Sequence, residues 1–164
     1  MALNILATYH RSLKIALPMT SPAATEILRG TMRLLLDLDL TSLPEFTLAT
    51  GRRVDLMGLA RDGRLVAVEV KSCRTDFLTD RKWQGYLGYA DQFYFAVAPG
   101  FPCDLLPAEE GLIVADRYAA SVIRPACPRA VAPARRRALL LRFARTAAAR
   151  LQGAADPDAG PEPG

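Results

Sequence analysis

The chain has 164 residues, a mass of 17.8 kDa and a formal net charge of +4, and its 51% hydrophobic and 23% charged residues are typical of a single globular domain. No apolar run approaches the ~18 to 20 residues that cross a bilayer, so we expect a soluble, cytoplasmic protein with no membrane partner. The three cysteines (Cys73, Cys103 and Cys127) form no C-x-x-C pair and His10 is the only histidine, which disfavours disulfide frameworks, zinc sites and histidine-based catalysis.

The first element that the sequence predicts is a helix from Ser21 to Asp37. Ser21 suits the N-cap and Pro22 the first helical position, and apolar residues then recur at helical spacing. Residues 1–20 form a poorly defined segment whose apolar part precedes its basic part, the reverse of a signal peptide. We therefore take residues 21–151 as one domain and expect no export.

After Pro44 the pattern changes to β-structure. Apolar and β-branched runs predict strands at residues 46–49, 54–60 and 65–71, joined as a β-meander. From Cys73 to Ala90 the alternation stops and a helix fits best, although Gly85 and Gly88 weaken that interpretation. Further strands are predicted at residues 92–98, 112–115 and 121–123.

The C-terminal part of the chain is basic. Residues 134–151 predict an amphipathic helix, and residues 152–164 form a Pro/Gly/acidic tail that we expect to be disordered. Between Arg117 and Ala155 there are nine arginines and no acidic residue, whereas the rest of the chain holds 12 basic and 17 acidic residues, a balance of −5. Such a patch attracts phosphate backbones, but a solvated helix face fits the charge equally well.

The stretch with the most chemical information is the hairpin of residues 52–72. In a strand, Glu69 and Lys71 share one face, whereas Val66, Val68 and Val70 point to the other. A two-residue loop would pair Asp55 with Val70, whereas a three-residue loop, with Gly63 left-handed, pairs Asp55 with Glu69. Glycine in that loop position favours the second arrangement. We therefore predict that Asp55 and Glu69 lie within reach of one ion.

This grouping predicts a metal site of hard oxygen ligands. Oxygens of Asp55 and Glu69, the backbone carbonyl of Val70 and water form a ligand set that Mg²⁺ or Mn²⁺ accepts. The metal would polarise a phosphate and activate a water, and Lys71 would position that water or neutralise charge on the phosphorane. The competing interpretation is a solvent-exposed strand face that carries an ordinary ion pair.

The order of these residues resembles the PD-(D/E)XK nuclease superfamily. More narrowly, the segments EVKS, TDFLTDRKW, YLGYAD and FYFAVA, followed by GLIVAD and ARRRALLLRFAR, are similar to the MmcB-like family of DNA-repair endonucleases over about residues 22–151. The resemblance implies an α/β protein with a mixed sheet, a restriction-endonuclease-like αβββαβ core, and a C-terminal amphipathic basic helix. It also implies a divalent metal and phosphodiester hydrolysis on DNA.

Carried over by position, the resemblance makes Asp55 and Glu69 metal ligands and Lys71 the catalytic lysine. Glu26 matches the glutamate that many superfamily members add from the first helix. Val54 stands where proline often precedes the aspartate. Gly88 stands where exonuclease-type relatives have the tyrosine of Q-x-x-x-Y, which disfavours processive end-resection.

Several residues around this motif are candidates for DNA contact. Arg74 and Lys82 would hold backbone phosphates, and Tyr86 would stack on a splayed base or orient water, unless it packs on the sheet. Arg52 and Arg53 lie at a strand edge, where phosphate contact and plain solvation fit equally. In the C-terminal helix the candidates are Arg135, Arg136 and Arg137.

Two functions remain in competition on this sequence. The first is a Mg²⁺-dependent DNA endonuclease acting in repair, in which Asp55 and Glu69 hold the metal. The second is a non-cleaving DNA-binding repair module that uses the basic C-terminal helix. A hydrolase of another phosphoester fits the arginine-rich helix less well. A small nuclease often needs a second subunit to cut both strands, so a homodimer is also considered.

Overall fold

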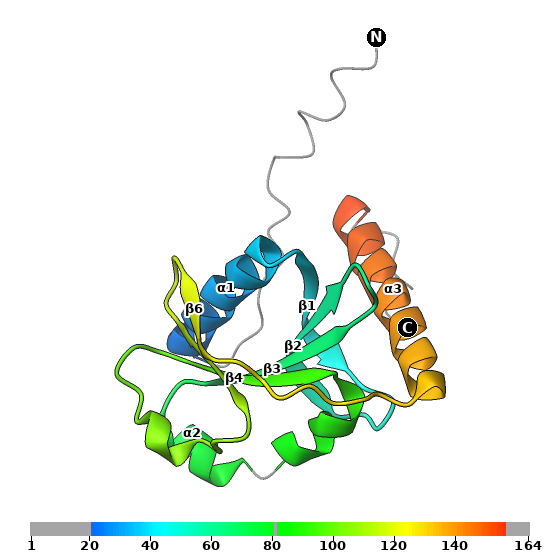
Figure 1. Ribbon diagram of the computed structural model, residues 1–164. Helices are drawn as coiled ribbons and strands as arrows, with labels where there is room; N and C mark the ends of the chain where they lie inside the picture. The colour runs from blue at the N-terminus through cyan, green and yellow to red at the C-terminus, as the bar shows by residue number, and fades with distance from the viewer. Residues whose placement is uncertain (1–20, 81, 157–164) are drawn as a thin grey trace.

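A computed structural model describes residues 21–80 and 82–156, which form one mixed sheet flanked by helices (Figure 1). The six strands lie in the order β1-β2-β3-β4-β5-β6; β1 to β3 are antiparallel, β3 to β5 are parallel, and β6 is antiparallel to β5. The elements are α1 (Pro22–Asp37), β1 (Leu40–Thr47), β2 (Arg53–Ala60), β3 (Leu65–Lys71), α2 (Arg74–Thr79), the 3₁₀ helix η1 (Trp83–Tyr89), β4 (Gln92–Val97), the 3₁₀ turn η2 (Cys103–Leu105), β5 (Gly111–Ala115), β6 (Ala120–Arg124) and α3 (Pro133–Ala155). This order confirms the predicted αβββαβ core.

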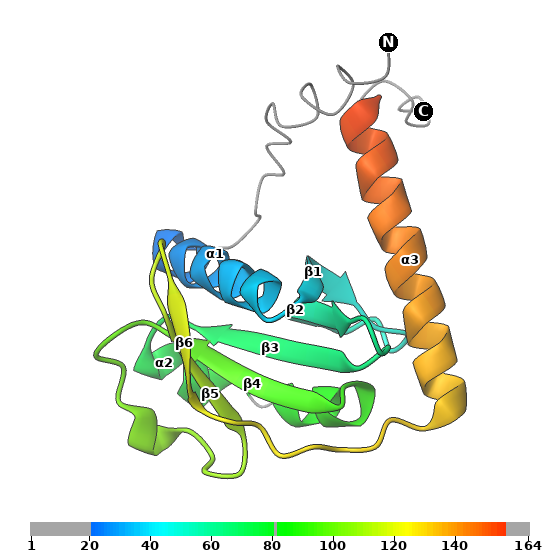
Figure 2. The same cartoon turned by 45° about the horizontal axis from the view of Figure 1, so that its top comes forward.

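Helix α1 begins where its capping residues predict. The backbone N–H of Ala24 donates to Ser21 Oγ at 3.1 Å, and Pro22 occupies the first turn. The helix packs on one face of the sheet, with Ile27 and Leu28 fully buried among the β3 valines. The opposite face packs against η1, and Leu139 and Phe143 of α3 join the same core cluster. Figure 2 shows α3 standing beside one end of the sheet.

The β2–β3 hairpin has the predicted three-residue loop. The N–H of Ala60 donates to Arg64 O at 2.9 Å, and Gly63 adopts a φ of +83°. The resulting register pairs Leu56 with Val68. The hairpin loop is thus confirmed, and the same register continued by one residue would set Asp55 opposite Glu69.

The predicted helix from Cys73 to Ala90 is wrong, because the segment divides into α2 and η1. Its glycines both lie in η1, where a Cβ on Gly85 would lie 1.8 Å from Arg52 Nη1 and one on Gly88 would lie 2.9 Å from Arg135 Nη1. Two arginines from distant parts of the chain thus approach the η1 backbone closely.

Two further boundaries differ from the prediction. Strand β1 begins at Leu40, six residues earlier than expected, and tolerates Pro44 because β1 is an edge strand. Helix α3 extends to Ala155, so residues 152–155 are helical and do not belong to a disordered tail. The expectations for residues 1–20 and 157–164 lie outside the described residues. Within the described part of the chain, no helix is long and apolar enough to cross a membrane.

Helix α3 is attached to the sheet at both ends. Near its start, Arg136 donates to both oxygens of the Asp91 carboxylate at 2.5 and 2.7 Å. Near its end, Arg150 donates to the carbonyl oxygens of Pro44 and Glu45 at 2.6 and 3.0 Å. Between these points Leu139 and Phe143 are the buried residues of the helix. Most of the α3 surface is therefore left to solvent.

Candidate active site

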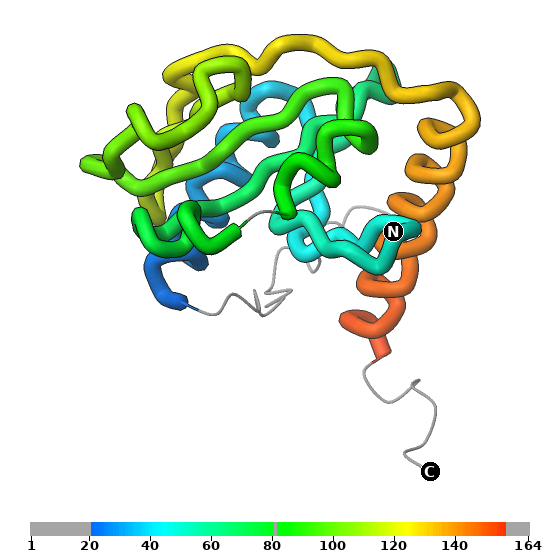
Figure 3. Tube along the Cα trace, turned by 90° about the horizontal axis from the view of Figure 1, so that it is seen from below, coloured from blue at the N-terminus to red at the C-terminus, as the bar shows by residue number. Residues whose placement is uncertain are grey.

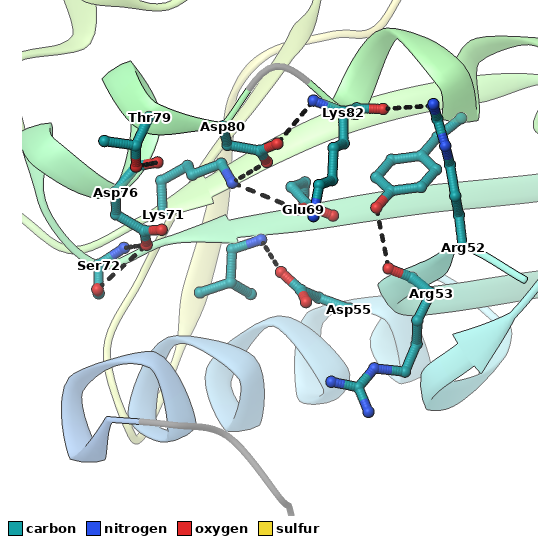
Figure 4. Close-up of polar contacts among 12 residues, drawn as sticks. Arg52, Arg53, Asp55, Glu69, Lys71, Ser72, Asp76, Thr79, Asp80 and Lys82 are labelled. Atoms are coloured by element: carbon teal, nitrogen blue, oxygen red, sulfur yellow. Dashed lines mark hydrogen bonds and ion pairs between the residues drawn. The ribbon is translucent and has the colours of Figure 1, made fainter.

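A polar cleft of about 560 Å³ lies at the end of β3, bounded by the start of α1, the α2 segment and η1. It contains Asp55, Glu69 and Lys71, as the sequence predicts, together with acidic side chains of the α2 segment (Figure 4). Its lining consists of Ser21, Ala24, Arg53, Asp55, Glu69, Val70, Lys71, Ser72, Asp76, Thr79, Asp80, Lys82 and Tyr86.

Asp55 reaches the cleft from β2. Its Oδ2 accepts a hydrogen bond from the N–H of Val70 at 2.8 Å, which ties the carboxylate to the neighbouring strand. Burial raises the pKa of Asp55 to about 6, although the Val70 N–H and the charge of Lys71 act in the opposite direction. The carboxylate is therefore short of favourable partners for its negative charge.

Glu69 is more strongly perturbed. Only 6% of the residue is exposed, and burial followed by the charge of Asp55 raises its pKa to about 8. Oε1 accepts from Lys71 Nζ at 3.3 Å, but Oε2 is buried without any hydrogen-bond partner among the described residues. A buried carboxylate oxygen in this state is costly unless a cation or a proton compensates it.

Lys71 is 2% exposed, and two carboxylates hold its ammonium group. Asp80 Oδ2 accepts from Nζ at 2.6 Å, a shorter contact than that to Glu69. Burial alone would lower the pKa of Lys71, but the two carboxylates outweigh it and raise the pKa above its usual value. The lysine is therefore a fixed positive charge inside the cleft.

Asp80 was not predicted to hold Lys71. It follows α2, and its second oxygen, Oδ1, accepts from the N–H of Lys82 at 2.7 Å. Burial raises the pKa of Asp80, but the hydrogen bonds from Lys71 and from the Lys82 N–H lower it by more. The pKa of Asp80 therefore lies below its usual value. The only signal in the sequence was its place in the TDRK segment that follows the lysine strand.

The residues of this cleft fit a divalent cation. Two carboxylates meet there, both with raised pKa values, and one buried Glu69 oxygen lacks a partner. The carboxylates are the hard ligands that Mg²⁺ and Mn²⁺ prefer. Across residues 21–80 and 82–156, no set of three or more His, Cys, Asp or Glu side chains is arranged to hold a metal. A cation here would thus depend on two acids completed by backbone and water oxygens.

Glu26 does not reach the cleft. It is exposed on α1 and is absent from the lining, where the helix contributes Ala24 and its cap Ser21. The reason is helical phase: Ala24, Ile27 and Leu28 form the buried face, and Glu26 lies off it. The structure therefore argues against the catalytic role that the resemblance implied for Glu26.

The predicted DNA-contacting residues near the cleft divide into two groups. Arg53 and Lys82 line it with exposed side chains, although Arg53 also pairs with Glu45 at 2.6 Å. Arg52 is exposed beside η1 and donates to Lys82 O at 3.3 Å. Arg74 is exposed at the start of α2, outside the lining.

Tyr86 is not free to stack on a base. It is 4% exposed, and its hydroxyl donates to Arg53 O at 3.0 Å. Burial raises the pKa of the phenol above its usual range, so the hydroxyl keeps its proton. The packing alternative considered for this tyrosine therefore fits the structure, with the hydroxyl at the wall of the cleft.

The three predicted arginines of α3 differ in their contacts. Arg136 is committed to Asp91 and to the carbonyl of Gly63, so the structure argues against its use for phosphate. Arg135 donates to Gly88 O at 2.8 Å and remains exposed. Arg137 is exposed and has no partner within the described ranges.

The fold and the cleft define a mixed α/β protein with a nuclease-like core and an acidic site that holds a buried lysine. A family model described as DNA repair protein MmcB-like matches residues 16–158, and the chain belongs to this DNA repair family.

The chain is also similar to a solved structure, the SPO1766 protein of unknown function from Silicibacter pomeroyi. The TM-score is 0.83 and the identity 43%, over 88% of this chain and 99% of that chain. A comparison with curated proteins found no match.

Proposed function

We propose that the protein is a metal-dependent DNA endonuclease that acts in repair by hydrolysing phosphodiester bonds. The observation that carries the proposal is the convergence of Asp55 and Glu69, from neighbouring strands, on one polar cleft with a buried lysine. The unpartnered Glu69 Oε2 supports it, because an ordinary surface ion pair would leave no buried oxygen unsatisfied. Membership in a DNA repair family supports the substrate class.

The metal ligands in this proposal are Asp55, Glu69 and the backbone carbonyl of Val70. Mg²⁺ or Mn²⁺ bound there supplies Lewis-acid polarisation of a phosphate oxygen and a water of lowered pKa. The Val70 N–H orients the Asp55 carboxylate through its hydrogen bond, so the ligand is held before any ion arrives.

Lys71 carries the positive charge that the reaction needs. Its ammonium group is held by Asp80, so it presents a fixed charge to the phosphate and stabilises the negative charge that develops in the transition state. Arg53 and Lys82, at the wall of the cleft, bind phosphates on either side of the bond that is cut.

One observation favours the alternative, a DNA-binding module that does not cleave. Lys71 already neutralises part of the charge of Glu69, and within the described residues no set of three or more His, Cys, Asp or Glu side chains is arranged to hold a metal. In that case Lys71 would be a structural ion-pair partner. The two functions make opposite predictions for catalysis and for metal binding.

The deciding experiment uses a panel of branched, nicked, flapped and single-stranded DNA in Mg²⁺ or Mn²⁺. We expect nicking by the wild type and its loss in Lys71→Met and Glu69→Gln, which keep side-chain volume. Asp39→Asn is the matched control, because Asp39 is exposed and pairs with Arg61 away from the cleft. Equal nicking by the wild type and Lys71→Met would identify a contaminating nuclease and overturn the proposal.

A further inference from the structure

A second hollow, the α3 groove, lies at the C-terminal end of η1. It is open, has a volume of about 560 Å³, and is formed by α3, the β1–β2 turn and the end of η1. Its floor is apolar and includes Ala49 and Leu139, whereas Arg135, Arg142 and Arg145 stand along it. Tyr89 closes one end.

The charge of this groove is positive and uncompensated. Helix α3 carries no acidic residue, and no acidic side chain lines the groove within the described residues. Arg142 and Arg145 are exposed and have no partner there. Arg135 lies over the Tyr89 ring, with Cζ 4.7 Å from the ring centroid. The charge of this groove therefore favours an anionic occupant.

The groove and the catalytic cleft both draw a lining residue from η1. Tyr86 lines the cleft and Tyr89, three residues later in η1, lines the groove. Between them Arg52 extends from the β1–β2 turn against Gly85 and donates to Lys82 O. Figure 3 shows this turn and η1 beside α3. A strand that leaves the cleft would meet positive side chains at each step toward the groove.

The apolar floor distinguishes between forms of DNA. A duplex keeps its bases stacked inside and offers phosphates, so it gains nothing from Leu139 or from the Tyr89 ring. An unpaired strand exposes the faces of its bases, which pack on aromatic and apolar side chains while arginines bind the phosphates. The combination of an apolar floor with an arginine rim therefore fits single-stranded DNA better than a duplex.

We propose that the α3 groove holds the unpaired strand of a flapped or branched DNA whose junction lies in the catalytic cleft. The inference rests on the proposed function in so far as it names the substrate of that site. Binding to the groove itself depends on Arg142, Arg145 and Tyr89, which lie outside the catalytic cleft.

The test measures binding in EDTA, where cleavage cannot contribute. Fluorescence anisotropy with oligo(dT) of about 12 nucleotides, a length within the usual site size, compares the wild type with the double variant Arg142→Gln/Arg145→Gln. We expect affinity to fall at least about tenfold and the salt slope to decrease by about 1.4. Arg29→Gln/Arg61→Gln is the control, because it removes the same charge from exposed positions outside both hollows.

A second variant tests the apolar part of the groove. Tyr89→Leu keeps an apolar side chain but removes the ring, and we expect at least about fivefold weaker binding of oligo(dT) with no change for a blunt duplex. Equal weakening by both arginine double variants, or equal weakening for duplex and single strand, would overturn the inference. A competition experiment gives a further outcome that would overturn the inference. If polyglutamate displaces labelled oligo(dT) at a lower concentration than unlabelled oligo(dT) does, the groove fits an acidic protein better than DNA.

These outcomes are separable from those of the nuclease assay. Tight, groove-dependent binding of oligo(dT) without nicking of any substrate would leave the groove in place and overturn the endonuclease. If Lys71→Met loses nicking but the groove variants bind oligo(dT) with the affinity of the wild type, only the inference about the groove is overturned.

Discussion

Lys71 Nζ lies 2.6 Å from Asp80 Oδ2 and 3.3 Å from Glu69 Oε1, so two acids share one buried ammonium group. A carboxylate that coordinates a cation attracts a lysine less strongly, because its charge is already neutralised. When Glu69 serves as a ligand, Asp80 remains to hold Lys71 in place. Asp80 thereby acts on the reaction through the position of Lys71.

We expect Asp80→Asn to lower the kcat for nicking by 10- to 100-fold, on the order that a small misplacement of a reacting group costs, with little change in KM. Asp80→Glu should recover part of the rate, because it restores the charge. Asp39→Asn should behave as the wild type. A rate for Asp80→Asn equal to that of the wild type, or no recovery in Asp80→Glu, would contradict a role through Lys71.

The raised pKa values of Asp55 and Glu69 predict an unusual pH dependence of stability. Both carboxyls bind protons more tightly in the folded state, so the associated stability is complete below their ordinary pKa values of 3.8 and 4.5. It is lost as pH rises through about 6 and about 8, respectively. In EDTA, urea denaturation should give a free energy of unfolding lower at about pH 8.5 than at about pH 5, by a few kcal/mol in order of magnitude.

Glu69→Gln should flatten most of this dependence, because the amide does not titrate. Mg²⁺ or Mn²⁺ added at about pH 8.5 should raise the melting temperature of the wild type and leave Glu69→Gln unchanged. A wild type whose stability is flat across this pH range, or whose melting temperature ignores both ions, would contradict the assignment of these two acids as a metal site.

Arg136 and Arg137 are adjacent in sequence but should differ in effect. Arg136→Gln removes hydrogen bonds to the Asp91 carboxylate and should cost about 1 to 3 kcal/mol of stability, measured by urea denaturation. Arg137→Gln should change stability by less than about 0.5 kcal/mol, because Arg137 is exposed and has no partner in the described parts of the chain. Equal costs for the two variants would show that the Asp91 contact contributes little.

Gly85 should be intolerant of alanine for DNA binding rather than for folding. A Cβ there would lie 1.8 Å from Arg52 Nη1, and the flexible guanidinium can move away only by leaving Lys82 O. Gly85→Ala should therefore weaken DNA binding as much as Arg52→Gln, and the double variant should be no worse than either. Gly153→Ala is the control, since no atom lies within 4 Å of its added Cβ. Independent losses in the double variant would contradict the mechanism.

The features that the sequence predicted well are local. Ser21 and Pro22 define the start of α1 within one turn, and Gly63 selects the hairpin loop that sets Asp55 opposite Glu69. Each depends on backbone preferences of residues next to one another in the chain. That locality explains why the core of the site was predictable without coordinates.

The features that the sequence did not predict depend on contacts between residues far apart in the chain. Arg136 reaches Asp91 across 45 positions, and no local pattern separates it from the exposed Arg137. Asp80 meets Lys71 because the chain breaks between α2 and η1, where a continuous helix was expected.

Glu45 lies at the junction of three parts of the molecule. Its backbone has a φ of +50°, an uncommon conformation for a side chain with a Cβ, and its carbonyl accepts from Arg150 of α3. Its carboxylate pairs with Arg53, which lines the catalytic cleft. A protein truncated just before Arg150 would thus lose the contacts that hold this irregular residue of β1, and through Arg53 the loss would reach the edge of the candidate cleft.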